Sequence, residues 1–399
     1  MGAAMIFRFR IRACVVVAAI VSAFSCAANA TIPTTERDAL IALYTNTNGA
    51  GWVASTGWNG AAGTECTWFG VACDGTSAHV ASISLSFNNL TGTIPSLDDL
   101  SNLQGFSVAF NQLTGTIPSL SGLSNLVYFD GSFNQLTGAI PSLSGLGNLQ
   151  GFYVAFNQLT GTIPSLAGLT NLANFLVVGN QLSGTIPSLS GLSNLQGFDG
   201  SFNQLSGAIP SLDGLGTLSH FDVSSNQLTG TIPSLSGLGN LLYFDVSSNQ
   251  LSGTMPSLSG LSNLGALYAG ANQLTGTIPS LSGLSNLVYF DGSFNQLTGT
   301  IPSLSGLGNL QGFYVGANQL TGAIPDLTGT ALTNFLVGAN HLDGALPVAP
   351  ISLAAGGSTL CPNDFPASSY VDDPAWDAAT GFTPWYTPCN LIFANGFEF

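Results

Sequence analysis

Residues 149–164 read LQGFYVAFNQLTGTIP, and this segment decides the fold because close copies of it follow one another along most of the chain. The asparagine at its centre, Asn157, recurs at a constant interval, 157 − 134 = 23, and only the last interval is shorter, 340 − 318 = 22. The recurring residues are Asn88, Asn111, Asn134, Asn157, Asn180, Asn203, Asn226, Asn249, Asn272, Asn295, Asn318 and Asn340. Self-similarity at a fixed period of this length predicts a solenoid in which each copy forms one turn.

The residues before each recurring asparagine alternate between inward and outward positions, which predicts a short strand. In the turn of Asn157, we expect Phe152 and Val154 to point into the core and Tyr153 to point to the concave surface. A single copy cannot bury its own apolar side, so neighbouring copies must stack and their strands must pair in a parallel sheet. The amide of each asparagine is expected to satisfy backbone groups where the chain leaves the strand, forming a ladder along the solenoid.

The first 30 residues have the layout of a secretory signal peptide, with arginines at its start, an apolar run and an A-x-A cleavage site at residues 28–30. A short membrane anchor and a lipid-modified Cys26 are the alternatives. The exposed apolar ends of a solenoid also need covers. We therefore predict a signal peptide at 1–30, an N-terminal cap at 31–79, the solenoid at 80–347 and a C-terminal cap at 348–399.

Four cysteines follow the predicted signal peptide: Cys66, Cys73, Cys361 and Cys389. An even number in an exported chain indicates disulfides, and three pairings are possible. Because the two pairs lie near opposite ends of the chain, the economical pairing joins Cys66 to Cys73 and Cys361 to Cys389. A zinc site built from all four is the alternative, and the lack of any C-x-x-C motif argues against it.

The consensus of the copies, L-x-x-F-x-V-x-x-N-Q-L-[TS]-G-[TA]-I-P, resembles the plant-type leucine-rich repeat over about residues 80–347. The segment from Glu36 to Pro95 is similar to the cap that precedes such repeats. The resemblance implies an α/β-type repeat solenoid: a right-handed superhelix of about 12 repeats, with a parallel concave sheet, an irregular or 3-10 convex side and disulfide-stapled caps. The family period is usually about 24 residues, so we expect a tighter outer turn here. Phenylalanine replaces most of the family's core leucines, which predicts a column of stacked rings.

The last residues, from Cys389 to Phe399, resemble a short ending found on exported proteins of some Gram-negative bacteria. This likeness implies a bacterial source and agrees with the predicted signal peptide.

The chain is almost free of basic charge. Four arginines and no lysine stand against 19 acidic residues, so the net charge is −15. Without residues 1–30, Arg37 alone faces all 19 acids, and the net charge becomes 1 − 19 = −18. Nucleic acids and anionic membranes bind clustered lysine and arginine, so the composition argues against both as partners. Apart from the N-terminal run, no stretch approaches the roughly 18–20 apolar residues that a spanning helix needs, so we expect no membrane insertion once the signal peptide is removed.

The sequence contains no motif of a known catalytic class such as GxSxG, HExxH or a P-loop. His79, His220 and His341 lie on separate turns, too far apart to share a metal ion. We interpret His220, two residues before Asp222 on the same strand, as a surface side chain. These observations predict no enzymatic activity, no catalytic residue, no cofactor and no metal.

The outward-facing strand positions are where the copies differ most from one another, and many of them carry tyrosine or aspartate. Tyrosine supplies a large contact area at low entropy cost, and adjacent aspartates favour a basic ligand. The alternative is an exposed sheet with ordinary polar residues. We predict ligand contact at Tyr128, Asp130, Tyr153, Asp199, His220, Asp222, Tyr243, Asp245, Tyr268, Tyr289, Asp291 and Tyr314.

These features favour a secreted, monomeric binding scaffold whose concave face recognises an extracellular protein, peptide or polysaccharide. The resemblance implies the same, because the plant-type family includes receptor ectodomains and free-standing polygalacturonase inhibitors. One alternative is a structural or adhesive surface protein without a single ligand. Another is ice binding through the Thr-x-Thr of each LTGTIP segment, such as Thr114 and Thr116, which we expect to stack directly from turn to turn. The predicted location is extracellular, with the periplasm or the cell surface as alternatives.

Overall fold

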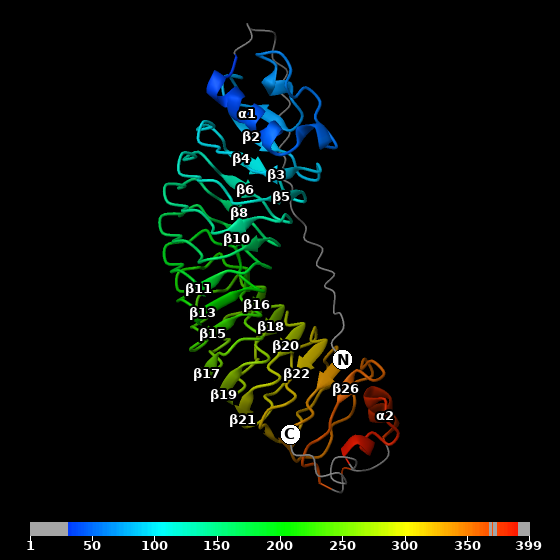
Figure 1. The fold of residues 1–399 in the computed structure, drawn as a ribbon. Helices are drawn as coiled ribbons and strands as arrows, with labels where there is room; N and C mark the ends of the chain where they lie inside the picture. Colours follow the sequence, from blue (N-terminus) through cyan, green and yellow to red (C-terminus); the bar gives the residue numbers. More distant parts are fainter. Residues whose placement is uncertain (1–30, 367–368, 370–372, 390–399) are drawn as a thin grey trace.

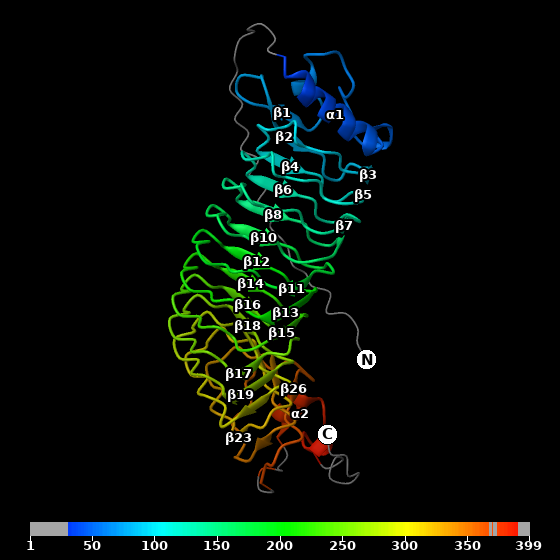
Figure 2. The same cartoon turned by 60° about the vertical axis from the view of Figure 1, so that its left-hand side comes forward.

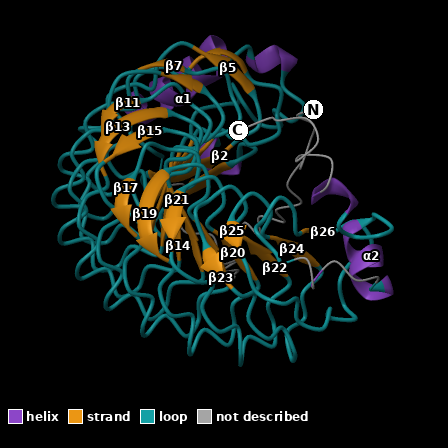
Figure 3. Ribbon diagram, turned by 90° about the horizontal axis from the view of Figure 1, so that it is seen from below, coloured by secondary structure: helices purple, strands orange, loops and turns teal. Residues whose placement is uncertain are grey.

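The chain forms an elongated, curved stack of short strands (Figures 1 and 2). This computed structural model describes residues 31–366, 369 and 373–389. The predicted signal peptide, and the C-terminal ending apart from Cys389, lie outside the described residues. Viewed along the stack, the strands lie toward the inside of the arc and the turns toward its outside (Figure 3).

One sheet of 14 strands runs along the concave side of the stack. Its members, in spatial order, are β1 (Val71–Cys73), β2 (Val80–Ser84), β4 (Gly105–Ser107), β6 (Tyr128–Asp130), β8 (Gly151–Tyr153), β10 (Asn174–Leu176), β12 (Gly197–Asp199), β14 (His220–Asp222), β16 (Tyr243–Asp245), β18 (Ala266–Tyr268), β20 (Tyr289–Asp291), β22 (Gly312–Tyr314), β24 (Asn334–Leu336) and β26 (Ser358–Thr359). The pair β1–β2 is antiparallel, and the later pairs are parallel. Equivalent positions face each other across the sheet: Phe152 lies opposite both Phe129 and Phe175.

A second set of parallel strands follows the ladder asparagines and forms a row along one flank (Figure 2). These are β3 (Thr91–Thr93), β5 (Gln112–Thr114), β7 (Thr137–Gly138), β9 (Gln158–Leu159), β11 (Ser183–Thr185), β13 (Gln204–Ala208), β15 (Gln227–Thr229), β17 (Ser252–Thr254), β19 (Gln273–Thr277), β21 (Gln296–Thr298), β23 (Thr321–Gly322) and β25 (His341–Leu342). Their register differs from that of the concave sheet, because Thr114 lies opposite Thr93 and not opposite its repeat equivalent, Thr91. The expectation that equivalent threonines stack directly is therefore wrong: the flank strands slant across the stack and offset them by two residues.

The convex side consists of tight turns. The backbone N–H of Leu123 donates to the carbonyl of Leu120 (3.0 Å), and that of Leu126 donates to Leu123 (2.9 Å). Bonds to the third preceding residue are the 3-10 pattern, so the irregular or 3-10 convex side implied by the sequence resemblance is confirmed.

A column of phenylalanine rings runs through the centre of the core. The rings of Phe152 and Phe175 have centroids 5.6 Å apart and planes within 15° of each other. Leu267 interrupts the column once, on β18. The predicted stack of rings is thus confirmed, and its members are Phe106, Phe129, Phe152, Phe175, Phe198, Phe221, Phe244, Phe290, Phe313 and Phe335.

The ladder asparagines join each turn to the one before it. Asn157 Oδ1 accepts the N–H of Leu136 (2.9 Å), and its Nδ2 donates to the carbonyl of Gly131 (3.0 Å), both in the preceding turn. The same Nδ2 also donates to Val154 in its own turn (3.2 Å). Asn88, at the start of the ladder, instead exchanges two hydrogen bonds with the backbone of Ala54 in the N-terminal cap.

The ladder has a further member that the sequence analysis missed. Asn363 follows Asn340 at the full repeat interval, accepts the N–H of Leu342 (2.9 Å) and donates to the carbonyl of Val337 (3.0 Å). Together with β26, it carries the solenoid into the segment predicted as the C-terminal cap. The spacing was a readable signal, but the LTG and IP residues that mark the other copies are absent around it.

The N-terminal end is covered by α1 (Thr34–Asn46), the 3-10 turns η1 (Gly49–Gly51) and η2 (Glu65–Thr67), and a cluster of buried tryptophans. Arg37 pairs with the buried Glu65 and lies over the ring of Trp68 (5.2 Å). A disulfide joins Cys66 to Cys73 beside this cluster.

The C-terminal end is covered by α2 (Pro374–Thr380), whose Trp376 packs against the last ring of the core column, Phe335, at 6.3 Å. A disulfide joins Cys361 to Cys389. In the described part of the chain, no helix has the length and apolar character needed to cross a membrane.

Candidate functional site

Each three-residue concave strand from β4 to β24 turns its first and third residues to the concave side and its middle residue to the core. In β14, Phe221 at the centre is fully buried, whereas His220 and Asp222 on either side of it are partly exposed. This follows from the two-residue alternation of a strand. Every residue predicted to contact a ligand, from Tyr128 to Tyr314, occupies such a flanking position, on β6, β8, β12, β14, β16, β18, β20 or β22. We call this predicted set the concave stripe.

The concave stripe divides into two groups. The smaller group contains Tyr128, Asp130 and Tyr153 on β6 and β8, with the two tyrosine rings 5.1 Å apart. The Tyr128 hydroxyl donates to Asp130 Oδ2 (3.0 Å). Leu176 on β10 stands between this group and the members on β12 to β22, so the stripe is not continuous.

The larger group holds a run of neighbouring rings. His220 stacks on Tyr243 with centroids 4.6 Å apart and planes within 11°. Tyr243 lies 5.7 Å from Tyr268, which lies 6.5 Å from Tyr289. The structure thus gathers side chains from four adjacent strands, β14 to β20, into one aromatic surface.

Glycines at the first outward position make room for these rings. A Cβ atom at Gly312 would lie 2.6 Å from the Tyr314 hydroxyl and 2.7 Å from Tyr289 Cδ1. Glycine at this position therefore leaves room for the tyrosine rings of its own strand and of the preceding one.

Asp199, Asp222 and Asp245 lie opposite one another on β12, β14 and β16. Burial, together with the Asp199 and Asp245 carboxylates, raises the pKa of Asp222 to about 8. Burial also raises the pKa of Asp199 and of Asp245. Beyond the predicted signal peptide, the only lysine or arginine is Arg37, and it pairs with Glu65 in the N-terminal cap. No lysine or arginine side chain therefore offsets these three carboxyl groups.

The pKa values of His220 and Tyr243, the uncharged neighbours of these aspartates, are also shifted. Burial lowers the pKa of His220 to about 4, so its imidazole is uncharged at neutral pH. Burial and the Asp245 carboxylate raise the pKa of Tyr243, whose hydroxyl stays protonated and donates to Asp245 Oδ2 (3.0 Å). The surface therefore combines hydrogen-bond donors, aromatic faces and acidic groups.

Serines that were not among the predicted site residues hold the aspartates in place. Each concave-stripe aspartate is followed two residues later by serine, as in Asp245–Ser247. The Ser247 N–H and hydroxyl both donate to Asp245 Oδ1, at 2.9 and 2.6 Å. Asp-x-Ser after each short strand was the signal that could have identified these supporting residues.

One imidazole and two carboxylates form the group best placed to hold a metal ion. Asp199, His220 and Asp222 each offer one ligand atom, and these atoms lie within 4.8 Å of one another. The grouping was not visible from the spacing of the histidines, because Asp199 comes from the neighbouring strand.

The flank row forms a second exposed surface, regular in composition. Thr114 and Thr116 are exposed, and the Thr114 hydroxyl donates to the carbonyl of Gly92 (3.1 Å). A Cβ at Gly115 would lie 2.8 Å from the methyl group of Thr93, so glycine allows that methyl to pack there. The orientations of the Thr114 hydroxyl and of the Thr93 methyl group are therefore fixed. Equivalent hydroxyl bonds are made by Thr137, Ser183, Ser206, Ser252, Thr275, Thr298 and Thr321.

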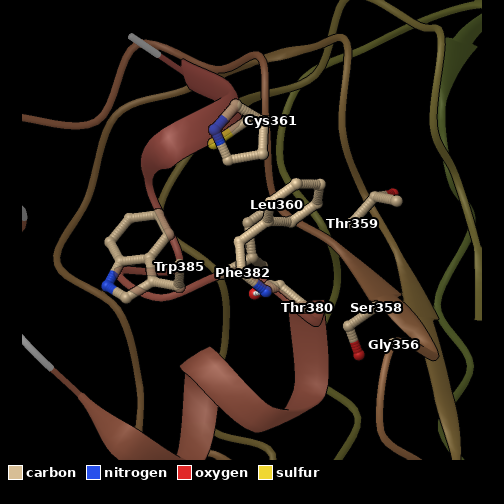
Figure 4. Close-up of a pocket in the computed structure, with 9 residues that line it drawn as sticks. Gly356, Ser358, Thr359, Leu360, Cys361, Thr380, Phe382 and Trp385 are labelled. Carbon is tan, nitrogen blue, oxygen red and sulfur yellow. Dashed lines mark hydrogen bonds between the residues drawn. The ribbon is translucent and has the colours of Figure 1, made fainter. Parts of the chain in front are cut away.

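The C-terminal cap contains a pocket of about 230 Å³ (Figure 4). Ser358, Phe382 and Trp385 are among its lining residues, and no concave-stripe residue is. The buried Ser358 hydroxyl has no hydrogen-bond partner among the described residues. None of the lining side chains titrates, since Cys361 is in a disulfide, so the pocket offers no acid–base or metal-binding group.

Residues 217–238 match the Leucine Rich Repeat family. The PEPR1–AtPEP1 structure is similar with a TM-score of 0.66 and 28% identity, over 84% of this chain and 52% of that one. The Arabidopsis receptor kinase HAESA, solved with the peptide hormone IDA and the co-receptor SERK1, gives 0.64 and 28%, over 84% of this chain and 62% of that one. This chain therefore spans less than two thirds of either of those two chains.

A plant ice-binding protein is also similar, with a TM-score of 0.57 and 26% identity. The match covers 81% of this chain and 99% of that protein.

Proposed function

Because this chain belongs to the leucine-rich-repeat proteins, whose stacked turns leave one face of a sheet uncovered, we propose that it is an extracellular binding scaffold. Its ligand is a peptide or protein that contacts the concave stripe, and it binds this ligand without transforming it. The proposal rests on the aromatic and acidic surface of β12 to β22, where turns that are otherwise near copies differ from one another. The PEPR1 and HAESA structures, each solved as a complex, support it by analogy.

The chemistry of the surface favours a ligand with basic side chains. Tyrosines from neighbouring strands provide wide, rigid contact area, as in many protein interfaces. Burial and their proximity raise the pKa values of Asp199, Asp222 and Asp245, and no lysine or arginine of the solenoid offsets them. A basic side chain of the ligand would stabilise their ionised forms, and complementary charge sets the register of binding. An extended, basic peptide lying across the strands would meet both features.

The double variant Tyr243→Ala/Asp245→Ala is expected to weaken ligand binding by at least about tenfold, because it removes a ring and a carboxylate at the centre of the larger group. The measurement is quantitative pull-down from extracellular material, followed by calorimetry with the recovered partner. Circular dichroism establishes that the variant remains folded.

A matched control comes from the same turn. Gln250→Ala/Thr254→Ala changes two exposed residues on the flank and should recover the partner as the unchanged protein does. If both double variants recovered the partner equally well, the concave stripe would not be the binding surface. If the unchanged protein recovered a glycan instead of a protein, the concave stripe would remain the proposed binding surface, but the ligand would be a polysaccharide.

A second candidate function is ice binding by the flank surface. The exposed threonines carry hydroxyl and methyl groups in fixed orientations, repeated on every turn where Ser or Ala does not replace them. The likeness to a plant ice-binding protein along 99% of its length supports this candidate. The two-residue offset makes the array oblique, so any match to ice would involve diagonal neighbours such as Thr93 and Thr114.

Purified protein is expected to show thermal hysteresis if this second candidate holds, and Thr231→Tyr should abolish most of it by disrupting the array. Thr170→Tyr makes the same change at an exposed position on the convex side and should have no effect. Absence of hysteresis and of recrystallisation inhibition in the unchanged protein rules this candidate out.

A further inference from the structure

Two adjacent strands bring an imidazole and two carboxylates together near the middle of the concave face. Asp199 on β12 lies opposite Asp222 on β14, and His220 is two residues before Asp222 on the same strand. One ligand atom from each residue lies within 4.8 Å of the other two. We propose that Asp199, His220 and Asp222 bind a divalent transition-metal cation, with Zn²⁺ as its simplest probe.

The two carboxylates are anchored as metal ligands require. Asp199 Oδ1 accepts both the N–H (3.0 Å) and the hydroxyl (2.6 Å) of Ser201, and among the described residues its Oδ2 has no hydrogen bond. Asp222 Oδ1 accepts the N–H of Ser224 (2.9 Å). Hydrogen bonds of this kind fix the orientation of a ligating carboxylate and increase its affinity for a metal.

The imidazole is oriented but has its nitrogens available. The ring of His220 is held against Tyr243 by stacking at 4.6 Å. Within the described part of the chain, neither of its ring nitrogens has a hydrogen-bond partner. Metals bind histidine through such a lone pair, so His220 is free to supply the nitrogen ligand.

Two other aspartates of the concave stripe, Asp245 and Asp130, have no free carboxylate oxygen. Both oxygens of Asp245 are occupied, Oδ2 by the Tyr243 hydroxyl and Oδ1 by Ser247. Asp130 is occupied in the same way by Tyr128 and by a serine N–H. In β14, His220 occupies the position that Tyr128 and Tyr243 occupy in β6 and β16. It makes no hydrogen bond like theirs to the aspartate two residues later, so its ring nitrogens remain available to a metal ion.

The ligand set selects the class of cation. Calcium and magnesium prefer oxygen ligands, whereas imidazole suits zinc and its neighbours in the first transition row. Three protein ligands leave at least one position for water or for a donor atom of a partner. Bonds of about 2.0–2.2 Å in tetrahedral geometry put ligand atoms roughly 3.3 Å apart, so the present separations must close by up to about 1.5 Å. Side-chain rotation on two hydrogen-bonded strands can supply that movement.

A bound cation would also supply positive charge to a region whose charged side chains are all acidic. Asp199, Asp222 and Asp245 occupy consecutive strands with no lysine or arginine near them, and burial and proximity disfavour their ionised forms. A divalent cation between the first two would stabilise both carboxylates.

The test uses untagged protein that has been treated with a chelator and then freed of it. Zn²⁺ alone is titrated by calorimetry, and thermal unfolding is followed at rising Zn²⁺. We expect saturation at one Zn²⁺ per chain and a melting temperature that rises with Zn²⁺ concentration, as for any ligand that binds only the folded state. His220→Ala and Asp222→Asn should each weaken the affinity at least about tenfold.

Two controls separate this site from adventitious binding. His341→Ala removes an exposed histidine paired with Asp364, and Asp291→Asn removes a concave aspartate that has no histidine beside it. Both should keep the unchanged affinity. Melting temperatures without Zn²⁺ show whether each variant is folded, and His220→Gln provides a second histidine variant if His220→Ala is not.

Two results would overturn the site: no saturable Zn²⁺ binding by the unchanged protein, or an equal loss in His341→Ala and His220→Ala. If the protein bound calcium and His220→Ala left that binding intact, the surface would bind cations through its carboxylates alone. This result would also reject the proposed site. Because the titration contains no peptide or protein ligand, its failure leaves the concave binding proposal untouched.

Discussion

Replacement of Phe175 by alanine is expected to lower the free energy of unfolding by about 3–5 kcal/mol. The ring is fully buried in the middle of the core column, with its centroid 5.6 Å from that of Phe152 and 5.8 Å from that of Phe198. The turns on either side are held at the strand spacing by backbone hydrogen bonds, so they cannot close the cavity that the substitution leaves. Chemical denaturation followed by far-ultraviolet circular dichroism measures the change.

Phe202→Ala is the matched control, because its ring is 60% exposed. The backbone of Phe202 has a positive φ of 50°, and the equivalent residues Ala271 and Ala317 adopt φ of 53° and 55°, so alanine is tolerated there. We expect a change within about 0.5 kcal/mol. Equal losses in the two variants would mean that the column does not stabilise the stack. A second unfolding transition in Phe175→Ala would show that the two halves of the solenoid have uncoupled, as nearest-neighbour stability allows.

Asn157→Ala is expected to cost about 3 kcal/mol, since it leaves several buried backbone groups without partners at about 1–3 kcal/mol each. The side chain satisfies the N–H of Leu136 and the carbonyls of Gly131 and Val154, and these groups lie where water cannot replace it. Because the bonds cross from one turn to the one before, the loss weakens an interface as well as a turn. The same denaturation experiment measures it.

Asn171→Ala tests whether position, and not residue type, determines that cost. Asn171 is exposed, and its side chain donates to the carbonyl of Gly147 (2.8 Å). Water can take over this bond, so the expected loss is below about 1 kcal/mol. If Asn157→Ala were no more destabilising than Asn171→Ala, the ladder would not be what holds successive turns together.

The rigidity that these variants probe is what gives the concave stripe its geometry. Its side chains stand on strands whose register is set by backbone bonds and by the phenylalanine column beneath them. A ligand on this face therefore meets strands whose spacing is already established, which lowers the entropy cost of binding.

The sequence by itself determined the features that belong to a single turn. The repeat period, the inward phenylalanines and the outward concave stripe follow from the recurrence of one segment and from the local alternation that any one copy displays. The same regularity predicted that turns must stack, because no copy can bury its apolar side alone. Asn363 could have been found by the period too, but not by the motif around it.

Only the tertiary structure decided how one turn meets the next. It offset the flank threonines by two residues, so that Thr93 and not Thr91 faces Thr114. It also placed Asp199 beside His220 and Asp222, and Trp376 at the end of the ring column. These relations depend on the slant and the hydrogen-bond register of neighbouring strands, which arise between turns and are therefore not encoded in the residues of any one of them.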